Sequence, residues 1–223
     1  MGSVIGEILP LAVGIAISPI PIIAVILMLL SPRAKGTSLG FMIGWIAGIV
    51  VAIVVFTLLS SVIPQDKGDG GSPVAGVIKI VLGLLLLFMA LRQWRGRPAK
   101  GAEATMPKWM SAIDSITAGK ALGLGFLLAA VNPKNLLMAA SAGVVVGGAS
   151  LAFSQAVIVI IIFVLLAGCT VIIPVIGYLI TSARLAGPLD RLREWLVDNN
   201  AVIMAVVLLV IGVAVIGKGI GEF

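Results

Sequence analysis

The chain has 223 residues, of which 61% are hydrophobic and 11% carry a charge, with a net charge of +6. Soluble domains average about 25% charged residues, so this composition excludes an ordinary soluble domain and indicates an integral membrane protein. Histidine is absent and Cys169 is the single cysteine, which excludes an intramolecular disulfide and leads us to expect neither a metal nor a cofactor.

Six stretches are long and apolar enough to cross a bilayer, which takes about 20 mostly apolar residues. They predict an all-α integral membrane protein with six transmembrane helices in one membrane domain. A basic linker, 92–118, separates a first three-helix repeat, 1–91, from a second, 119–223. In chain order the six segments are 4–30, 37–63, 74–91, 119–147, 151–180 and 201–217.

The first and fourth segments each contain a proline motif near the middle. The first holds "SPIP", with Ser18, Pro19 and Pro21, and the fourth holds "NPKN", which begins at Asn132. Serine and asparagine are good N-caps, and proline is favoured at the first helical position. We therefore predict that each segment consists of two half-helices with a short joint between them. A proline kink without any functional role is the alternative.

The two halves of the chain resemble each other weakly. The second and fifth segments open alike, with "SLGF" from Ser38 and "SLAF" from Ser150, and both run to a proline, Pro64 and Pro174. Three helices per half give the halves opposite topology, so the pattern predicts the 3+3 inverted repeat of many transporters. Small residues at four-residue spacing in the second segment predict close helix packing there: Gly40, Gly44 and Gly48.

Lysine and arginine gather on one predicted side of the membrane, which the positive-inside rule assigns to the cytoplasm. Both termini would then face outward from the inner (plasma) membrane. This role in orientation explains the net positive charge, and we expect no nucleic-acid partner. The stretch "PLDRLREWLVDNN", from Pro188, predicts an amphipathic helix in the headgroup layer, apart from the sixth segment. The basic side holds Arg33, Lys35, Arg92, Arg95, Arg97, Lys100, Lys108, Lys120, Arg184, Arg191 and Arg193, and the other side Lys67, Lys79 and Lys218.

Lys134 lies deep within the fourth segment, far from any carboxylate in the sequence. A charge at the bilayer centre costs at least about 2.5–3.5 kcal/mol, so intramembrane lysines generally have a function. Either a neutral amine or an anionic ligand would relieve that cost. The motif therefore predicts a site for a carboxylate, phosphate or sulfate, although the asparagines could instead bond neighbouring helices. The candidate site residues are Ser18, Pro19, Pro21, Asn132, Pro133, Lys134 and Asn135.

The stretch "PKWMSAIDSITAGKALGLGFLLAAVNPKNLLMAASAG", 107–143, carries three elements in order: Trp-(x)4-Asp, Thr-Ala-Gly-Lys and Asn-Pro-Lys-Asn. With the six-segment plan, it resembles the lysine exporter (LysE) superfamily. Within that superfamily the chain looks most like the GAP family of actinobacterial peptidoglycolipid addressing proteins, also called Sap or sulfolipid-addressing proteins. The resemblance implies a six-helix exporter associated with envelope glycolipids, with Asp114 and Lys120 as cytoplasmic motif positions.

The first functional hypothesis is a transporter or flippase that exports an anionic envelope lipid by alternating access. Arg92, Arg95 and Arg97 would gather anionic heads or serve only to set topology. Coupling to a proton gradient through Lys134 is one energy source, and a homodimer or an envelope-assembly protein is an expected partner. One alternative is a LysE-type exporter of small carboxylates such as amino acids; another is a non-transporting accessory subunit of lipid biosynthesis. An enzyme is not expected.

Overall fold

The computed structural model describes residues 1–61, 73–97, 116–181 and 186–223. Every regular element in these ranges is a helix. Four helices are long and apolar enough to cross a membrane, or up to six if each of two bent pairs is one span, so the chain is a membrane protein. In order the helices are α1 (Gly2–Ala16), α2 (Pro19–Leu30), α3 (Ala34–Ser61), α4 (Pro73–Arg95), α5 (Ala118–Ala130), α6 (Pro133–Gly148), α7 (Phe153–Thr181) and α8 (Ala186–Ile220).

Two pairs of short helices are bent at a proline. Helix α1 ends at Ala16 and α2 begins at Pro19, with a bend of 51° between them. Helix α5 ends at Ala130 and α6 begins at Pro133, with a bend of 60°. Proline lacks the N–H that would continue the preceding helix and already has the φ of a first helical residue.

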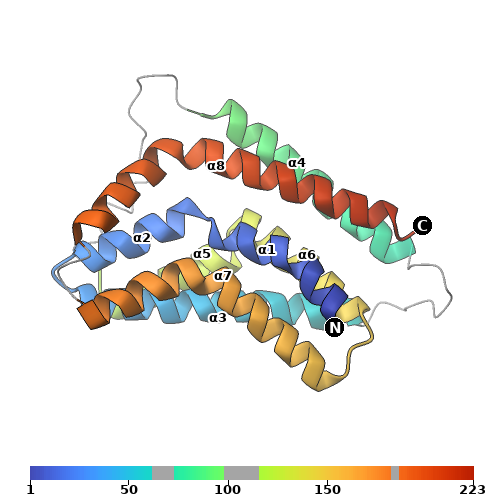
Figure 1. The fold of residues 1–223 in the computed structure, drawn as a ribbon, viewed down its shortest axis with the longest axis horizontal. Coiled ribbons are helices and arrows are strands. Elements are labelled where there is room, and N and C mark those ends of the chain that lie inside the picture. Colours follow the sequence, from blue (N-terminus) through green and yellow to red (C-terminus); the bar gives the residue numbers. More distant parts are fainter. Residues whose placement is uncertain (62–72, 98–115, 182–185) are drawn as a thin grey trace.

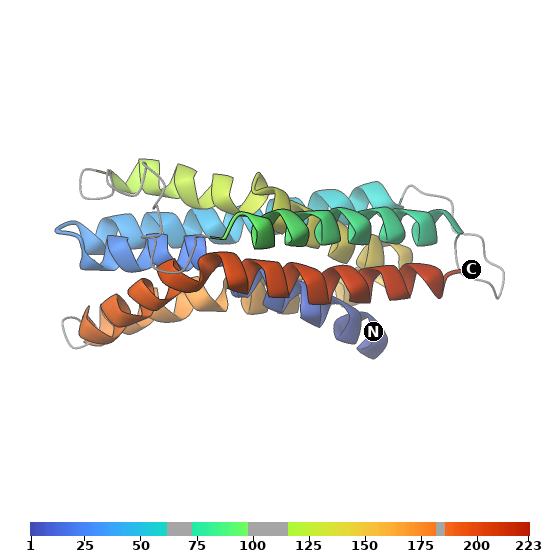
Figure 2. The same cartoon turned by 90° about the horizontal axis from the view of Figure 1, so that it is seen from above.

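The helices run along one long axis, and the two chain termini lie at the same end of the bundle, here called the termini end (Figures 1 and 2). Helix α3 packs on α5 and α6, whereas α7 packs on α1 and α2, and α4 pairs with α8. The largest fully buried side chains include Trp45, Phe41 and Phe163.

The glycines of α3 allow its close approach to α5, as the sequence predicted. A Cβ atom on Gly44 would lie 1.9 Å from the carbonyl oxygen of Leu122, and one on Gly40 would lie 2.3 Å from that of Ala118. Helix α5 contributes Gly125, where a Cβ atom would lie 2.3 Å from the carbonyl oxygen of Phe41. At each of these contacts a glycine of one helix lies against a backbone carbonyl of the other helix.

The expected separation of an amphipathic helix from the sixth segment is wrong. From Ala186 onward the chain forms the single 35-residue helix α8, which continues to Ile220. No proline or glycine interrupts the chain between Pro188 and Ile211, so nothing local ends the helix. The amphipathic stretch is buried only in part, since Leu189 and Leu196 are buried, whereas Leu192 and Trp195 are exposed. Pro64, a predicted end of the second segment, lies outside the described residues.

Candidate functional site

The two helix breaks meet through polar side chains in the interior of the bundle. The Nζ atom of Lys134 donates hydrogen bonds to the carbonyl oxygen of Gly14, at 2.7 Å, and to the hydroxyl of Ser18. The Ser18 hydroxyl in turn donates to Oδ1 of Asn135 at 3.2 Å. Lys134 and Ser18 are 4% exposed and Asn135 is 1% exposed. We call Gly14, Ser18, Lys134 and Asn135 the central network.

The break in each helix pair supplies the carbonyl groups that these side chains use. In an unbroken helix the carbonyl of Gly14 would accept from the amide of Ser18, but that amide donates to Ile15 instead, at 3.1 Å. The free Gly14 carbonyl then accepts from Lys134. In the second pair, Nδ2 of Asn135 donates to the carbonyl of Leu128 at 2.9 Å. Backbone carbonyls at the two breaks thus gain side-chain partners.

Helix α7 also contributes to the first break. The hydroxyl of Thr170 donates to the carbonyl of Ala16 at 2.7 Å. The carbonyls of Gly14 and Ala16 belong to the last turn of α1, which is the negative end of its helix dipole. Lys134 therefore faces partial negative charge from the backbone, and no carboxylate in the described ranges pairs with it.

The remaining predicted residues of the two motifs are divided between the interior and the surface. Pro19 and Pro21 are buried in the first turn of α2. Asn132 is half-buried, and its side chain caps α6 by accepting from the amide of Lys134 at 3.0 Å. Pro133 is exposed on the outside of the bundle. The structure thus brings Ser18, Lys134 and Asn135 together and leaves Pro133 away from them.

The predicted cytoplasmic positions that the structure describes are exposed and lie at or next to helix ends. Arg92 and Arg95 are exposed in the last turn of α4. The Arg97 guanidinium lies 4.1 Å from the centre of the Trp94 ring, a cation–π contact. Lys120 is exposed in the first turn of α5, and Asp114 lies outside the described residues.

An apolar cavity of about 470 Å³ lies between α4 and α8 beside these arginines. Trp94 lines it together with residues of both helices. The cavity is therefore continuous with the basic end of α4. Its lining consists of Leu87, Ala90, Leu91, Trp94, Ala205, Val206 and Leu209.

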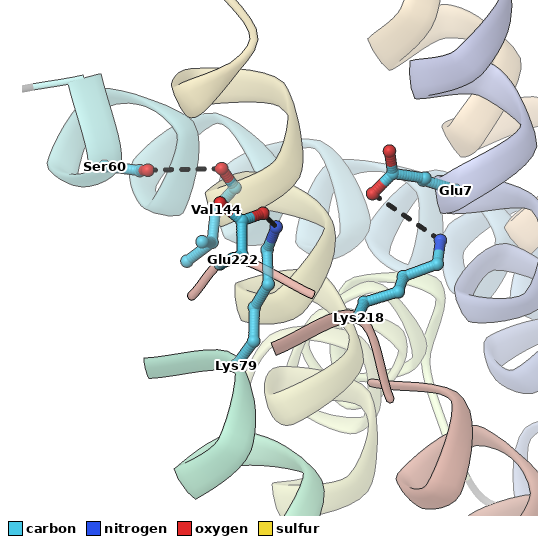
Figure 3. A network of polar contacts seen from close by, with 6 residues as sticks. All are labelled: Glu7, Ser60, Lys79, Val144, Lys218 and Glu222. Atoms are coloured by element: carbon cyan, nitrogen blue, oxygen red, sulfur yellow. Dashed lines mark hydrogen bonds and ion pairs between the residues drawn. The ribbon is translucent and has the colours of Figure 1, made fainter. Parts of the chain in front are cut away.

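Four charged residues at the termini end form ion pairs that the sequence analysis did not predict (Figure 3). Lys79 of α4 pairs with Glu222, and Lys218 of α8 pairs with Glu7 of α1 at 3.5 Å. A cavity of about 300 Å³ lies beside them, lined in part by Glu7, Lys79 and Glu222. The sequence does contain a feature that could have predicted these ion pairs. Two lysines and two glutamates lie in or next to apolar segments on the same predicted side of the membrane. The hydroxyl of Ser60 also joins α3 to α6 at this end, donating to the Val144 carbonyl at 3.4 Å.

The comparison with known families finds one match over nearly the whole chain. The model described as "Sap, sulfolipid-1-addressing protein" matches residues 8–221. Neither the search of curated proteins nor the search of solved structures finds a match to the chain.

Proposed function

Because the chain belongs to the Sap, or sulfolipid-1-addressing protein, family, we propose that it transports an anionic envelope lipid across the membrane. The lipid carries a sulfate or phosphate head group, and the two bent helix pairs move during transport. The alternating-access mechanism and the type of head group are inferred from the chemistry of the central network, beyond what the family name says.

The observation that carries this proposal is the placement of Lys134. Its buried amino group is held by one carbonyl and one hydroxyl, at the point where two interrupted helices meet. Neutral oxygen partners balance an ammonium less well than an anion does, because a charged acceptor makes a stronger hydrogen bond. A sulfate or phosphate that reached Lys134 would therefore compete well for its donors.

The packing of the helices supports a 3+3 inverted repeat, which is the second part of the proposal. The second helix of each half packs on the bent pair of the other half, so that α3 packs on α5 and α6, and α7 on α1 and α2. The third helices of the two halves, α4 and α8, pack on each other. In inverted-repeat transporters one repeat moves against the other around a site between them.

The α4–α8 cavity supports a lipid as the cargo. Its apolar lining suits acyl chains, and the exposed Arg92 and Arg95 at the same end of α4 suit an anionic head. We place this end in the cytoplasm, following the positive-inside rule. Single cysteines in a Cys169→Ser background test that orientation. A membrane-impermeant maleimide should label Gly221→Cys in intact cells and should label Gly187→Cys only after lysis.

Transport is tested with a matched pair of fluorescent lipids in proteoliposomes. NBD-labelled galactosylceramide 3-sulfate and its unsulfated counterpart differ only in the anionic group, and dithionite reports how fast each crosses the bilayer. The protein should accelerate the sulfated lipid selectively. Lys134→Met should lower that rate by about tenfold or more, since each 1.4 kcal/mol of lost transition-state binding is a factor of ten. Lys35→Met, an exposed cation of α3, is the control and should retain the rate.

Equal acceleration of both lipids would contradict selection of an anionic head. No acceleration of either would favour the second candidate, an exporter of small carboxylates. The residues of the central network are enclosed and almost inaccessible. In this respect the network favours the exporter of small carboxylates. Efflux of amino acids that depends on Lys134 would identify it. Normal lipid export in cells that carry Lys134→Met would instead indicate an accessory subunit.

A further inference from the structure

Three helices present lines of residues that run from the central network to the termini end. Along each helix the residues follow one another at three- or four-residue spacing, so they lie on one face. The lines end at the ion pairs described above. On α1 the line runs from Gly14 to Glu7, on α6 from Lys134 to Ser141, and on α8 from Ile211 to Lys218.

Two apolar side chains close this route next to the central network. A Cβ atom on Gly14 would lie 2.2 Å from Cδ1 of Ile211 and 2.8 Å from the sulfur of Met138. Ile211 is 4% exposed and Met138 is fully buried. These side chains therefore fill the space beside the residue whose carbonyl holds Lys134. Methionine is unbranched and flexible, and the Ile211 contact is made by the terminal carbon of its side chain.

Beyond these two side chains the route widens in two steps. A small cavity of about 20 Å³ is lined by Leu11, Ser141 and Ile211, among others. Glu7 and Lys79 line both this cavity and the 300 Å³ cavity at the termini end. Lys218 lines only the inner cavity of the two and Glu222 only the outer one, so each ion pair has residues at both cavities.

Lys79 needs an anionic partner at all times, whereas the Lys218 side chain is 36% exposed and is also reached by water. Lys79 is 7% exposed, and an ammonium buried to that degree is costly unless it is paired. Glu222 supplies the pairing for Lys79, and Glu7 supplies it for Lys218. A sulfate or phosphate offers the same charge and the same oxygen acceptors as a carboxylate. It can therefore replace either glutamate without leaving a lysine unpaired.

We propose that Lys79 and Lys218 form a second anion site, which receives the sulfate or phosphate head group as it leaves the central network. Glu222 and Glu7 occupy the lysines between transport events and keep the termini end closed. This inference rests on the proposed function for the identity and direction of the cargo. The site itself, an anion-selective opening at the termini end, can be tested without any lipid.

The test measures how fast charged thiol reagents reach Ser141, which lies between the two sites. Ser141→Cys is placed in a Cys169→Ser background and treated with anionic MTSES or cationic MTSET, both membrane-impermeant, on intact cells. In the Glu7→Gln/Glu222→Gln variant the lysines lose their internal partners. MTSES should then react about tenfold faster than in the parent, because a cleft lined by one charge concentrates the opposite charge by that order, whereas MTSET should gain little.

The reciprocal variant makes the test specific to charge. Lys79→Gln/Lys218→Gln leaves the glutamates and should favour MTSET over MTSES. Equal gains for both reagents would indicate loosened packing and overturn the proposal, as would an unchanged MTSES rate or no labelling of Ser141→Cys in any variant. Ser38→Cys, buried in the first turns of α3 at the opposite end, is the control and should not respond.

The lipid assay and the labelling assay test the proposed cargo and the proposed exit site separately. If the labelling shows the expected selectivity and the sulfated lipid is not transported, the anion site stands and the proposed cargo is wrong. If the lipid is transported and the labelling shows no selectivity, the cargo stands and the exit site is wrong.

Discussion

The Nζ atom of Lys134 donates a hydrogen bond to the backbone carbonyl of Gly14, 120 residues earlier in the chain, at 2.7 Å. This contact links the start of α6 to the last turn of α1. It depends on both helix breaks, because one frees the carbonyl and the other places the lysine in the first turn of a new helix. A movement of either bent pair must therefore break this bond or carry both partners with it.

Ser18→Ala should destabilise the protein by about 1–3 kcal/mol, the usual cost of leaving buried polar groups without a partner. The Ser18 hydroxyl accepts from Lys134 and donates to Asn135, so its loss affects both residues. The apparent unfolding midpoint in detergent measures this effect. Ser31→Ala is the control, because its hydroxyl donates to Met28 within the same turn. A larger loss in the control would contradict a special role for Ser18.

Thr170→Val should also lower the unfolding midpoint, by an amount that corresponds to about 1–3 kcal/mol. Valine keeps the shape of the side chain but removes the donor to the Ala16 carbonyl. Thr57→Val is the matched control, since the buried Thr57 hydroxyl has no hydrogen-bond partner within the described part of the chain. The control should be neutral or stabilising, and equal losses in the two variants would mean that the Ala16 contact contributes nothing.

Gly44→Ala should destabilise the α3–α5 contact by about 1–3 kcal/mol, the typical cost of overpacking. Its new Cβ atom would meet a backbone oxygen at 1.9 Å, which no side-chain rotation relieves. Gly123→Ala on α5 has no atom within 4 Å of the new Cβ and should stabilise its helix by up to about 1 kcal/mol. Thermal unfolding of the two variants should therefore shift in opposite directions. A shift in the same direction would refute the close-packing argument.

Asn132→Ala should cost about 1 kcal/mol, because it removes the side-chain cap at the start of α6. Asn132→Ser should restore most of that stability, since serine is an equally good N-cap. Asn132 is only half-buried and bonds the amide of Lys134, not its ammonium. Lipid transport by Asn132→Ser should therefore match the wild type. A transport defect in the serine variant would instead assign Asn132 a direct role in binding.

The sequence alone determined the features that depend on a few neighbouring residues. Long apolar segments predict membrane helices because the bilayer interior forces the backbone to bond within its own segment. The order Ser18-Pro19 and Asn132-Pro133 predicts where α2 and α6 begin, because proline geometry is local. The predicted side-chain cap forms at Asn132, whereas the Ser18 side chain makes no such cap. The glycine spacing around Gly44 likewise predicts a close helix contact, because it depends only on neighbouring residues of one helix.

The tertiary structure decided which distant residues become partners. The glycine face of α3 predicts a close contact but does not say that α5 supplies it. The sequence shows that Lys134 lacks a nearby carboxylate, yet its carbonyl partner exists only because α1 ends beside the start of α6. The pairs of Lys79 with Glu222 and Lys218 with Glu7 likewise depend on how α1, α4 and α8 converge at the termini end. The angles between packed helices set these partners, and such angles depend on the whole interface between helices and not on a local motif.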